Sequence, residues 1–290
     1  MNESQSLKVG GAMTWWSCGK FVQRAPLLDA LTYLDLNKYA PGARTPIASL
    51  RSALEEIFPT RSMRVEHLVN RQAFEVVEII RGETANDYRS RWWVGIDKDL
   101  QVEVKPYDLG MGNRVVSAFN KHKGLVTANE VTNALLQILG SLQGTYLRQK
   151  GGVYWLPGHQ VDTWRLIACA VEGVPTQGEK NQVHLMTHQW GPDEVRAVKD
   201  AITREVESEA HRLHSEILPP EGQEFLGEKA LEHRKCQAED LARKVQLYEE
   251  LLGTGLDSLK ATLERVSDAA CNAALLIAAG APSGKEVVVA

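Results

Sequence analysis

Hydrophobic residues in the first part of the chain recur at the spacing of amphipathic helices. Within residues 25–36 and 45–58 they lie three and four positions apart, which places them on one side of a helix. In the second segment Thr45 precedes Pro46, a pair typical of an N-cap and the first helical position. The sequence therefore predicts a pair of helices over residues 25–58.

The pattern changes between residues 64 and 107, where β-branched and aromatic residues are frequent and apolar positions tend to alternate. This alternation is typical of half-buried strands. The connections are too short for crossover helices, and Asp97-Lys98-Asp99 has the composition of a tight turn, so an antiparallel meander is expected. Trp92 and Trp93 should face opposite sides of this sheet, one in the core and one outside, where a ring can anchor an interface.

Residues 110–122 and 127–143 have the apolar spacing of two further helices. Thr127 and Glu130 stand at the spacing of a capping box at the start of the second helix. Two glycines at 151–152 separate aromatic-rich runs and predict a hairpin that ends at residue 157.

The order helix, helix, hairpin over residues 110–157 is similar to that of a winged helix, a DNA-binding unit. Five basic residues of this unit would then contact phosphate groups; they are Arg114, Lys121, Lys123, Arg148 and Lys150. The polar face of the second helix carries no Arg or Lys, unlike most recognition helices. A purely structural unit is therefore the alternative interpretation.

From residue 191 to about residue 280 the apolar positions again step by three and four, with breaks at Pro219-Pro220 and at Gly253-Thr254-Gly255. This pattern predicts an antiparallel helical hairpin or coiled coil. Its most regular seam contains Leu256, Leu259, Leu263, Val266 and Ala270. The seam either packs within the chain or forms an oligomer or partner interface. Charged residues of both signs, Glu239 and Lys244 among them, are expected on its exposed flanks.

Together these patterns predict an α+β fold. We expect an α+β domain over residues 1–190, a helical coiled-coil region over residues 191–280, and a flexible tail over residues 281–290.

The net charge is −4, so the chain is not a basic nucleic-acid coat, and any nucleic-acid binding requires a local patch. Its four cysteines form no CxxC pair, which argues against a zinc ribbon and a secreted disulfide framework. The N-terminus lacks the pattern of a signal peptide, and no run of 18 apolar residues occurs. These features predict a cytoplasmic protein with reduced thiols and no membrane partner.

Candidate chemical sites are few. The glycines at 110–112 do not extend to a phosphate-binding GxGxxG motif, because Val115 occupies the third glycine position. His211 and His214 would share one face of a helix, where solvent exposure is the alternative to a metal site. Glu103 and Lys105 form half of a divalent-metal nuclease motif, and a second carboxylate is needed on a neighbouring strand. No cofactor is predicted.

The run from Gly151 to Pro157 reads Gly-Gly-Val-Tyr-Trp-Leu-Pro, and a predicted helix, a strand and a charged helical segment follow it. In this GGVY-x-x-P hairpin and in the order of elements, the chain resembles an uncharacterised family of bacterial, archaeal and phage proteins. The resemblance implies a phage or mobile-element setting. No activity is known for that family, so the resemblance implies no functional residues.

These observations predict a non-enzymatic interaction or assembly protein that self-associates, or holds a protein partner, through its C-terminal helices. One alternative is a nucleic-acid-binding protein that uses the unit at residues 110–157. The other is a divalent-metal nuclease centred on Glu103 and Lys105.

Overall fold

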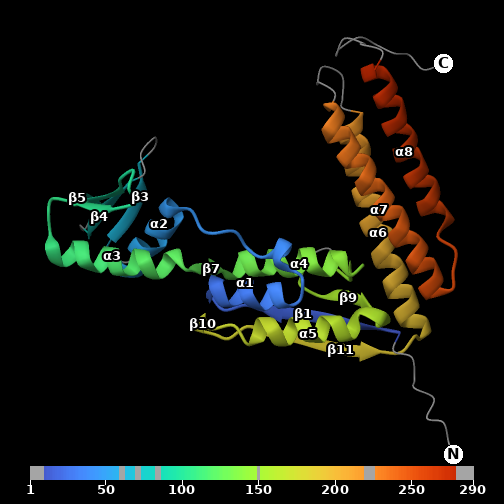
Figure 1. Ribbon diagram of the computed structural model, residues 1–290, viewed down its shortest axis with the longest axis horizontal. Helices are drawn as coiled ribbons and strands as arrows, with labels where there is room; N and C mark the ends of the chain where they lie inside the picture. Colours follow the sequence, from blue (N-terminus) through green and yellow to red (C-terminus); the bar gives the residue numbers. More distant parts are fainter. Residues whose placement is uncertain are drawn as a thin grey trace, which may run out of the picture. The chain divides into compact units, whose positions relative to one another are not determined.

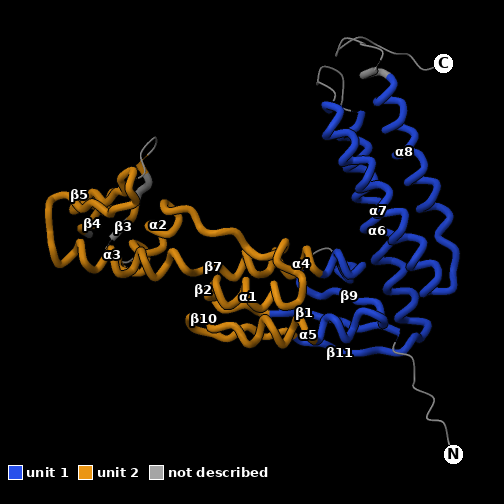
Figure 2. The backbone as a smooth tube through the Cα atoms, viewed as in Figure 1, with its two compact units in different colours: residues 1–16, 139–165, 184–290 blue, residues 17–138, 166–183 orange. Residues whose placement is uncertain are grey.

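The computed structural model describes residues 10–58, 63–68, 73–81, 86–148, 151–218 and 226–278, with the α+β fold drawn in Figure 1. The chain forms two compact units, shown in Figure 2. Unit 1 contains residues 1–16, 139–165 and 184–290, and unit 2 contains residues 17–138 and 166–183. These boundaries differ from the predicted division at residue 190, because strands from before that residue belong to the same unit as the C-terminal helices.

In unit 2 four strands form an antiparallel sheet in chain order; they are β3 (Met63–His67), β4 (Ala73–Arg81), β5 (Asn86–Ile96) and β6 (Val102–Lys105). The predicted meander is therefore confirmed. The turn between β5 and β6 is closed by Asp97, whose Oδ1 accepts hydrogen bonds from the backbone N–H of Asp99 at 2.9 Å and of Gln101 at 2.8 Å. A short aspartate side chain suits this role, because it can reach backbone groups two residues away.

Two helices supply the core on one face of this sheet: α2 (Pro46–Ile57) and α3 (Leu109–Lys123). Their buried side chains pack with those of β4 and β5 in one cluster, which includes Leu50, Leu54, Phe74, Val94, Val115 and Phe119. The predicted start of α2 is confirmed, since Thr45 Oγ1 accepts a hydrogen bond from Ala48 N and Pro46 is the first helical residue.

The two adjacent tryptophans of β5 face opposite sides of the sheet, as predicted. Trp92 packs against the core cluster and stacks on Phe58, with ring centroids 5.5 Å apart. Trp93 lies on the other face, where the Lys105 ammonium group is 4.9 Å from its ring centroid. The Trp93 ring covers Gly95, and any β-carbon at that glycine would overlap the ring.

A second sheet of unit 2 places β2 (Phe21–Gln23) between β10 (Thr176–Gln177) and β7 (Leu125–Thr127), antiparallel to both. Helix α1 (Arg24–Tyr33) continues directly from β2, a short 3-10 helix spans Asn37–Tyr39, and α4 (Ala128–Ser141) continues from β7. The buried side chain of Asn181 ties distant segments together. It accepts from Gly19 N at 3.1 Å and donates to the Val171 carbonyl at 2.9 Å.

The capping box at the start of α4 is confirmed. Glu130 Oε2 accepts from Thr127 N at 2.6 Å, and Thr127 Oγ1 accepts from Glu130 N at 3.3 Å. The buried side chains of α3 belong to the cluster under β4 and β5, whereas among the described residues those of α4 lie outside it. A helix-turn-helix packs its two helices together, so the similarity to a winged helix is limited to the order of elements.

Unit 1 contains a four-stranded sheet in the order β11 (Gln182–His188), β1 (Gly11–Ser17), β9 (Tyr154–Pro157) and β8 (Thr145–Tyr146). The predicted hairpin is confirmed by antiparallel pairing of β8 and β9, with Thr145 opposite Trp155. A 3-10 helix (Gly158–Gln160) follows, and then α5 (Val161–Glu172), of which residues 161–165 belong to unit 1 and the rest to unit 2. Thr14, fully buried in β1, accepts from the Trp164 indole N–H at 2.8 Å and donates to the His184 carbonyl at 2.9 Å.

The C-terminal region of unit 1 is a bundle of three helices, α6 (Pro192–Ile217), α7 (Glu228–Leu252) and α8 (Asp257–Ala278), each in contact with the other two (Figure 1). The three predicted helical segments are thus present, and they pack together as one bundle. Gly253 ends α7 in the left-handed conformation, with φ +61°, which glycine adopts without steric cost. Among the described residues no helix is long and apolar enough to cross a membrane.

Candidate functional site

The predicted seam of α8 lies inside the bundle. All five of its residues are at most 4% exposed, and they belong to the core cluster shared with α6 and α7; they are Leu256, Leu259, Leu263, Val266 and Ala270. Of the two readings that the sequence left open, the structure therefore shows packing within the chain. A surface on which another molecule can dock has to be found among the outward-facing residues of these helices.

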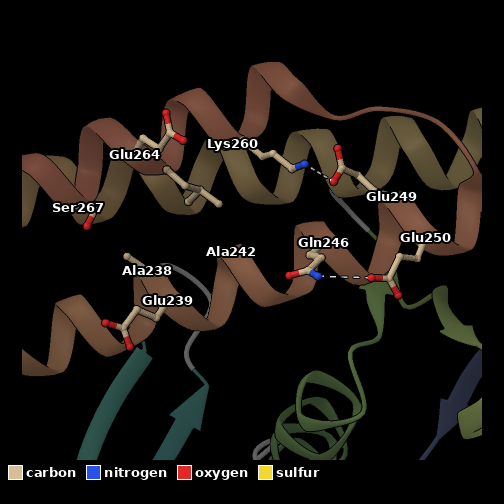
Figure 3. A pocket seen from close by; sticks show the side chains of 10 residues that line it. Ala238, Glu239, Ala242, Gln246, Glu249, Glu250, Lys260, Glu264 and Ser267 are labelled. Carbon is tan, nitrogen blue, oxygen red and sulfur yellow. Dashed lines mark hydrogen bonds and ion pairs between the residues drawn. The ribbon is translucent and has the colours of Figure 1, made fainter.

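Such a surface exists between α7 and α8, where a groove of about 580 Å³ opens (Figure 3). We call it the α7/α8 groove. It is lined by Ala238, Glu239, Ala242, Gln246, Glu249, Glu250, Lys260, Leu263, Glu264 and Ser267. Buried Ala238 and Leu263 lie at its base, and Ala238 and the exposed residues Ala242 and Ser267 are small. Small side chains leave room for another backbone to approach closely.

The charge of the groove is negative. Its lining holds four glutamates and one lysine. The Lys260 ammonium group lies 2.5 Å from Glu249 Oε2, and Glu249 Oε1 also accepts from Leu256 N at 2.7 Å. These hydrogen bonds lower the pKa of Glu249, and the bond to Glu249 raises the pKa of Lys260. The one cation of the lining is therefore already paired.

The other three glutamates keep their charge available to a ligand. Among the residues that the structure describes, Glu250 accepts from the Gln246 amide alone, at 3.4 Å (Figure 3). Within the described ranges, neither Glu239 nor Glu264 forms an ion pair. Residues four apart lie on one side of a helix, so the positions 238, 242, 246 and 250 of α7 bring alanine, glutamine and glutamate to one edge of the groove.

One residue expected on the exposed flanks is instead buried: Lys244 is 6% exposed. Its ammonium group donates to Glu205 Oε1 at 2.5 Å and to the Gly144 carbonyl at 2.6 Å. The expectation of exposure was wrong because α7 packs against α6 and against the loop before β8, which heptad spacing does not reveal. The same loop is held by Tyr248, whose hydroxyl donates to the Gln143 carbonyl at 2.8 Å.

The basic residues proposed for nucleic-acid binding are spread over both units. In unit 2, Arg114 and Lys123 are exposed on α3, while Lys121 is bound to Glu56 at 2.9 and 3.0 Å. Arg148 is exposed in unit 1, and Lys150 lies outside the described residues. No single unit therefore assembles the set.

The proposed catalytic pair and the candidate metal ligands are at the surface. The Lys105 ammonium group lies 3.2 Å from Glu103 Oε2, and both side chains are largely exposed. His211 and His214 are exposed on α6. The described residues contain no group of three or more His, Cys, Asp or Glu that could hold a metal ion. The four cysteines, of which only Cys18 is partly buried, are all free thiols.

Comparison with known proteins places the chain in a family. Residues 10–280 match the family model described as "Family of unknown function (DUF6744)". The chain belongs to this family. DUF6744 has no assigned activity, which agrees with the resemblance to an uncharacterised family. No curated protein and no solved structure matches the chain.

The α7/α8 groove was not predicted from the sequence of this DUF6744 member. A signal for it exists, because α7 carries alanines at 238 and 242 on the same helix as glutamates at 239, 249 and 250. That signal is incomplete without tertiary structure, since the other side of the groove comes from α8.

Proposed function

We propose that this protein holds a partner protein by binding a basic amphipathic helix of that partner in the α7/α8 groove. The observation that carries the proposal is an acidic groove with small residues in its lining, on helices whose apolar seam is already buried within the chain. As in the prediction from sequence, the C-terminal helices bind the partner. The interface, however, is the outer face of α7 and α8 instead of the buried seam.

The shape of the groove supports a helical occupant. A helix binds in a groove through side chains at positions i, i+3, i+4 and i+7. Ala238, Ala242 and Ser267 leave space for such side chains and for the helix backbone. The volume, about 580 Å³, lies in the range of about 300–1,000 Å³ typical of binding pockets.

The charge of the groove supports a basic occupant from another protein. In a symmetric dimer the same patch meets itself, which would place Glu239 and Glu264 against their own copies. Like charges brought together across an interface disfavour that contact. Phosphate groups are repelled for the same reason, so nucleic acid does not suit this groove.

The test measures binding of a labelled basic helical peptide to the full chain by fluorescence anisotropy. The peptide is an amphipathic sequence of lysine, leucine and alanine, about 18 residues or five helical turns long. We expect the double variant Glu239→Lys/Glu264→Lys to lose roughly tenfold in affinity or more, because two attractive charges become repulsive.

A matched control separates the groove from general attraction between opposite charges. Glu207→Lys/Glu232→Lys makes the same change in net charge on exposed residues of α6 and α7 that do not line the groove. Its affinity should stay within about twofold of the parent at physiological salt, where charges beyond about 8 Å are screened. Equal losses in both variants, or no binding of the peptide, would overturn the proposal.

A further inference from the structure

Strand β11 forms one edge of the four-stranded sheet of unit 1, since that sheet runs in the order β11-β1-β9-β8. Residues 182–183 of this seven-residue strand belong to unit 2, and residues 184–188 belong to unit 1. Among the described residues, the backbone of 184–188 has hydrogen-bond partners only in β1 and at Gly10 just before it. The other side of the strand therefore presents backbone N–H and C=O groups that are free to pair with another strand.

The opposite edge of the same sheet is covered. Strand β8 is two residues long, and two basic side chains of the helical bundle bind the backbone on either side of it. Lys244 donates to the Gly144 carbonyl at 2.6 Å, and Arg204 donates to the Leu147 carbonyl at 3.1 Å. Within the described part of unit 1, the edge that stays open to another strand is thus the one at β11.

The sequence of β11 lacks the features by which proteins keep edge strands from pairing. Charged side chains, proline and bulges are the usual ones. Residues 184–188 read His-Leu-Met-Thr-His, without Lys, Arg, Asp, Glu or Pro. In unit 2 the edge strands β10 and β7 are two and three residues long, whereas β3 and β6 contain charged residues. The edge at β11 is therefore suited to strand pairing.

The side chains beside this edge favour contact with another apolar surface. Met186, at the centre of residues 184–188, is 48% exposed. His184 is also exposed and stacks on Trp15 of β1, with ring centroids 5.2 Å apart. Residues two apart lie on the same face of a strand, so Met186 and His184 form one apolar and aromatic surface next to the open edge.

We propose that β11 pairs with β11 of a second copy of this protein, so that the two four-stranded sheets join into one. A two-fold axis perpendicular to the sheet brings identical edges together antiparallel. Residues 184–188 contain no fixed charge, so no like charges meet in this contact. The strand is already extended and paired on its other side. Pairing with it therefore costs less conformational entropy than pairing with a disordered peptide, which has to be ordered first.

This interface is independent of the proposed partner binding. Strand β11 contributes no residue to the lining of the α7/α8 groove. Peptide binding and self-association are measured in separate experiments, so either proposal can fail while the other stands.

Sedimentation velocity of the full chain over a concentration series tests the pairing. One short strand from each copy buries little surface, so we expect a weak dimer with a micromolar Kd, well populated at about 100 µM. Met186→Lys places two like charges within the paired edges and should weaken the dimer at least about tenfold. Because Met186 is already exposed, this variant should fold, which circular dichroism checks.

A matched control and a second readout assign the dimer to β11. Leu275→Lys makes the same kind of change at an apolar residue of α8 that is 69% exposed, and it should leave the Kd within about twofold of the parent. Hydrogen–deuterium exchange reports backbone pairing directly. Amides within residues 184–188 should become more protected as the concentration of the parent rises, and should gain less protection in Met186→Lys.

Three results would rule out the pairing of β11 with its copy. One is a monomer at every concentration. Another is equal weakening of the dimer in Met186→Lys and Leu275→Lys, which would show a general effect of added charge. The third is a dimer that gives residues 184–188 no additional protection, which would place the interface on another surface.

Discussion

The ammonium group of Lys244 lies 2.5 Å from the carboxylate of Glu205, in a part of the bundle where the lysine side chain is 8% exposed and the glutamate side chain 23% exposed. The other oxygen of Glu205 accepts from the Thr145 hydroxyl, and Lys244 also donates to the Gly144 carbonyl. This pair joins α6, α7 and the start of β8. Both charged groups have a further hydrogen-bond partner, so removing either charge should lower the stability of the fold.

We expect Lys244→Ala to lower the free energy of unfolding by about 3 kcal/mol, because it leaves the Glu205 carboxylate without its cation. Urea unfolding followed by circular dichroism measures the change. Arg243→Ala is the matched control, since Arg243 pairs with Asp240 in solvent and an exposed pair contributes at most about 1 kcal/mol. Similar losses in the two variants would contradict the buried-pair interpretation.

Tyr248 provides a second test of the contact between the bundle and the loop before β8. Its hydroxyl donates to the Gln143 carbonyl at 2.8 Å, and burial raises its pKa well above 10. Tyr248→Phe should lower the free energy of unfolding by about 1 kcal/mol, the usual contribution of one such hydrogen bond. The same urea experiment measures it, and an unchanged midpoint would show that the hydrogen bond contributes nothing.

Stability should depend on pH through His122, which is fully buried in α3. Burial lowers its pKa below 6.5, although Glu56, at 2.8 Å from Nε2, acts in the opposite direction, while Lys121 and Arg44 add to the lowering. Below pH 6.5 the unfolded chain binds a proton that the folded chain does not, so stability falls as pH decreases from about 6.5 towards the folded pKa.

The size and origin of this effect can be checked with one variant. The slope should not exceed about 1.4 kcal/mol per pH unit for a single group. Thermal unfolding midpoints between pH 7.5 and 5.5 should therefore decline less steeply in His122→Gln than in the parent. The lowered pKa of Glu56 affects stability only at more acidic pH, below its ordinary value of about 4.3. Parallel pH profiles for the two proteins would exclude His122 as the cause.

Gly11 should not tolerate any side chain. A β-carbon there meets both the Trp155 ring and the Leu156 carbonyl oxygen, and backbone atoms cannot move aside. We expect Gly11→Ala to lower the free energy of unfolding by about 2 kcal/mol, within the range measured for overpacked sites. Gly42→Ala is the control, because nothing lies within 4 Å of its added carbon. Differential scanning calorimetry of both variants decides the point, and equal Tm values would count against the close packing.

Short-range sequence patterns correctly predicted several features of the local structure. The capping box of Thr127 and Glu130, the turn at Asp97 and the hairpin between β8 and β9 were all predicted and are present. Each involves residues within about a dozen positions of one another, so spacing and side-chain chemistry determine it directly. The opposite directions of Trp92 and Trp93 follow in the same way from the two-residue period of a strand.

Only the tertiary structure decided where those elements place their side chains. Lys244 and Glu239 both belong to the charged stretch of α7, yet one is buried against Glu205 and the other lines a groove. Trp155 and Glu194 lie 39 positions apart in the sequence and line one cavity. Helical periodicity specifies which residues share a face, but burial depends on what packs against that face, and here the packing partners are distant segments such as the loop before β8.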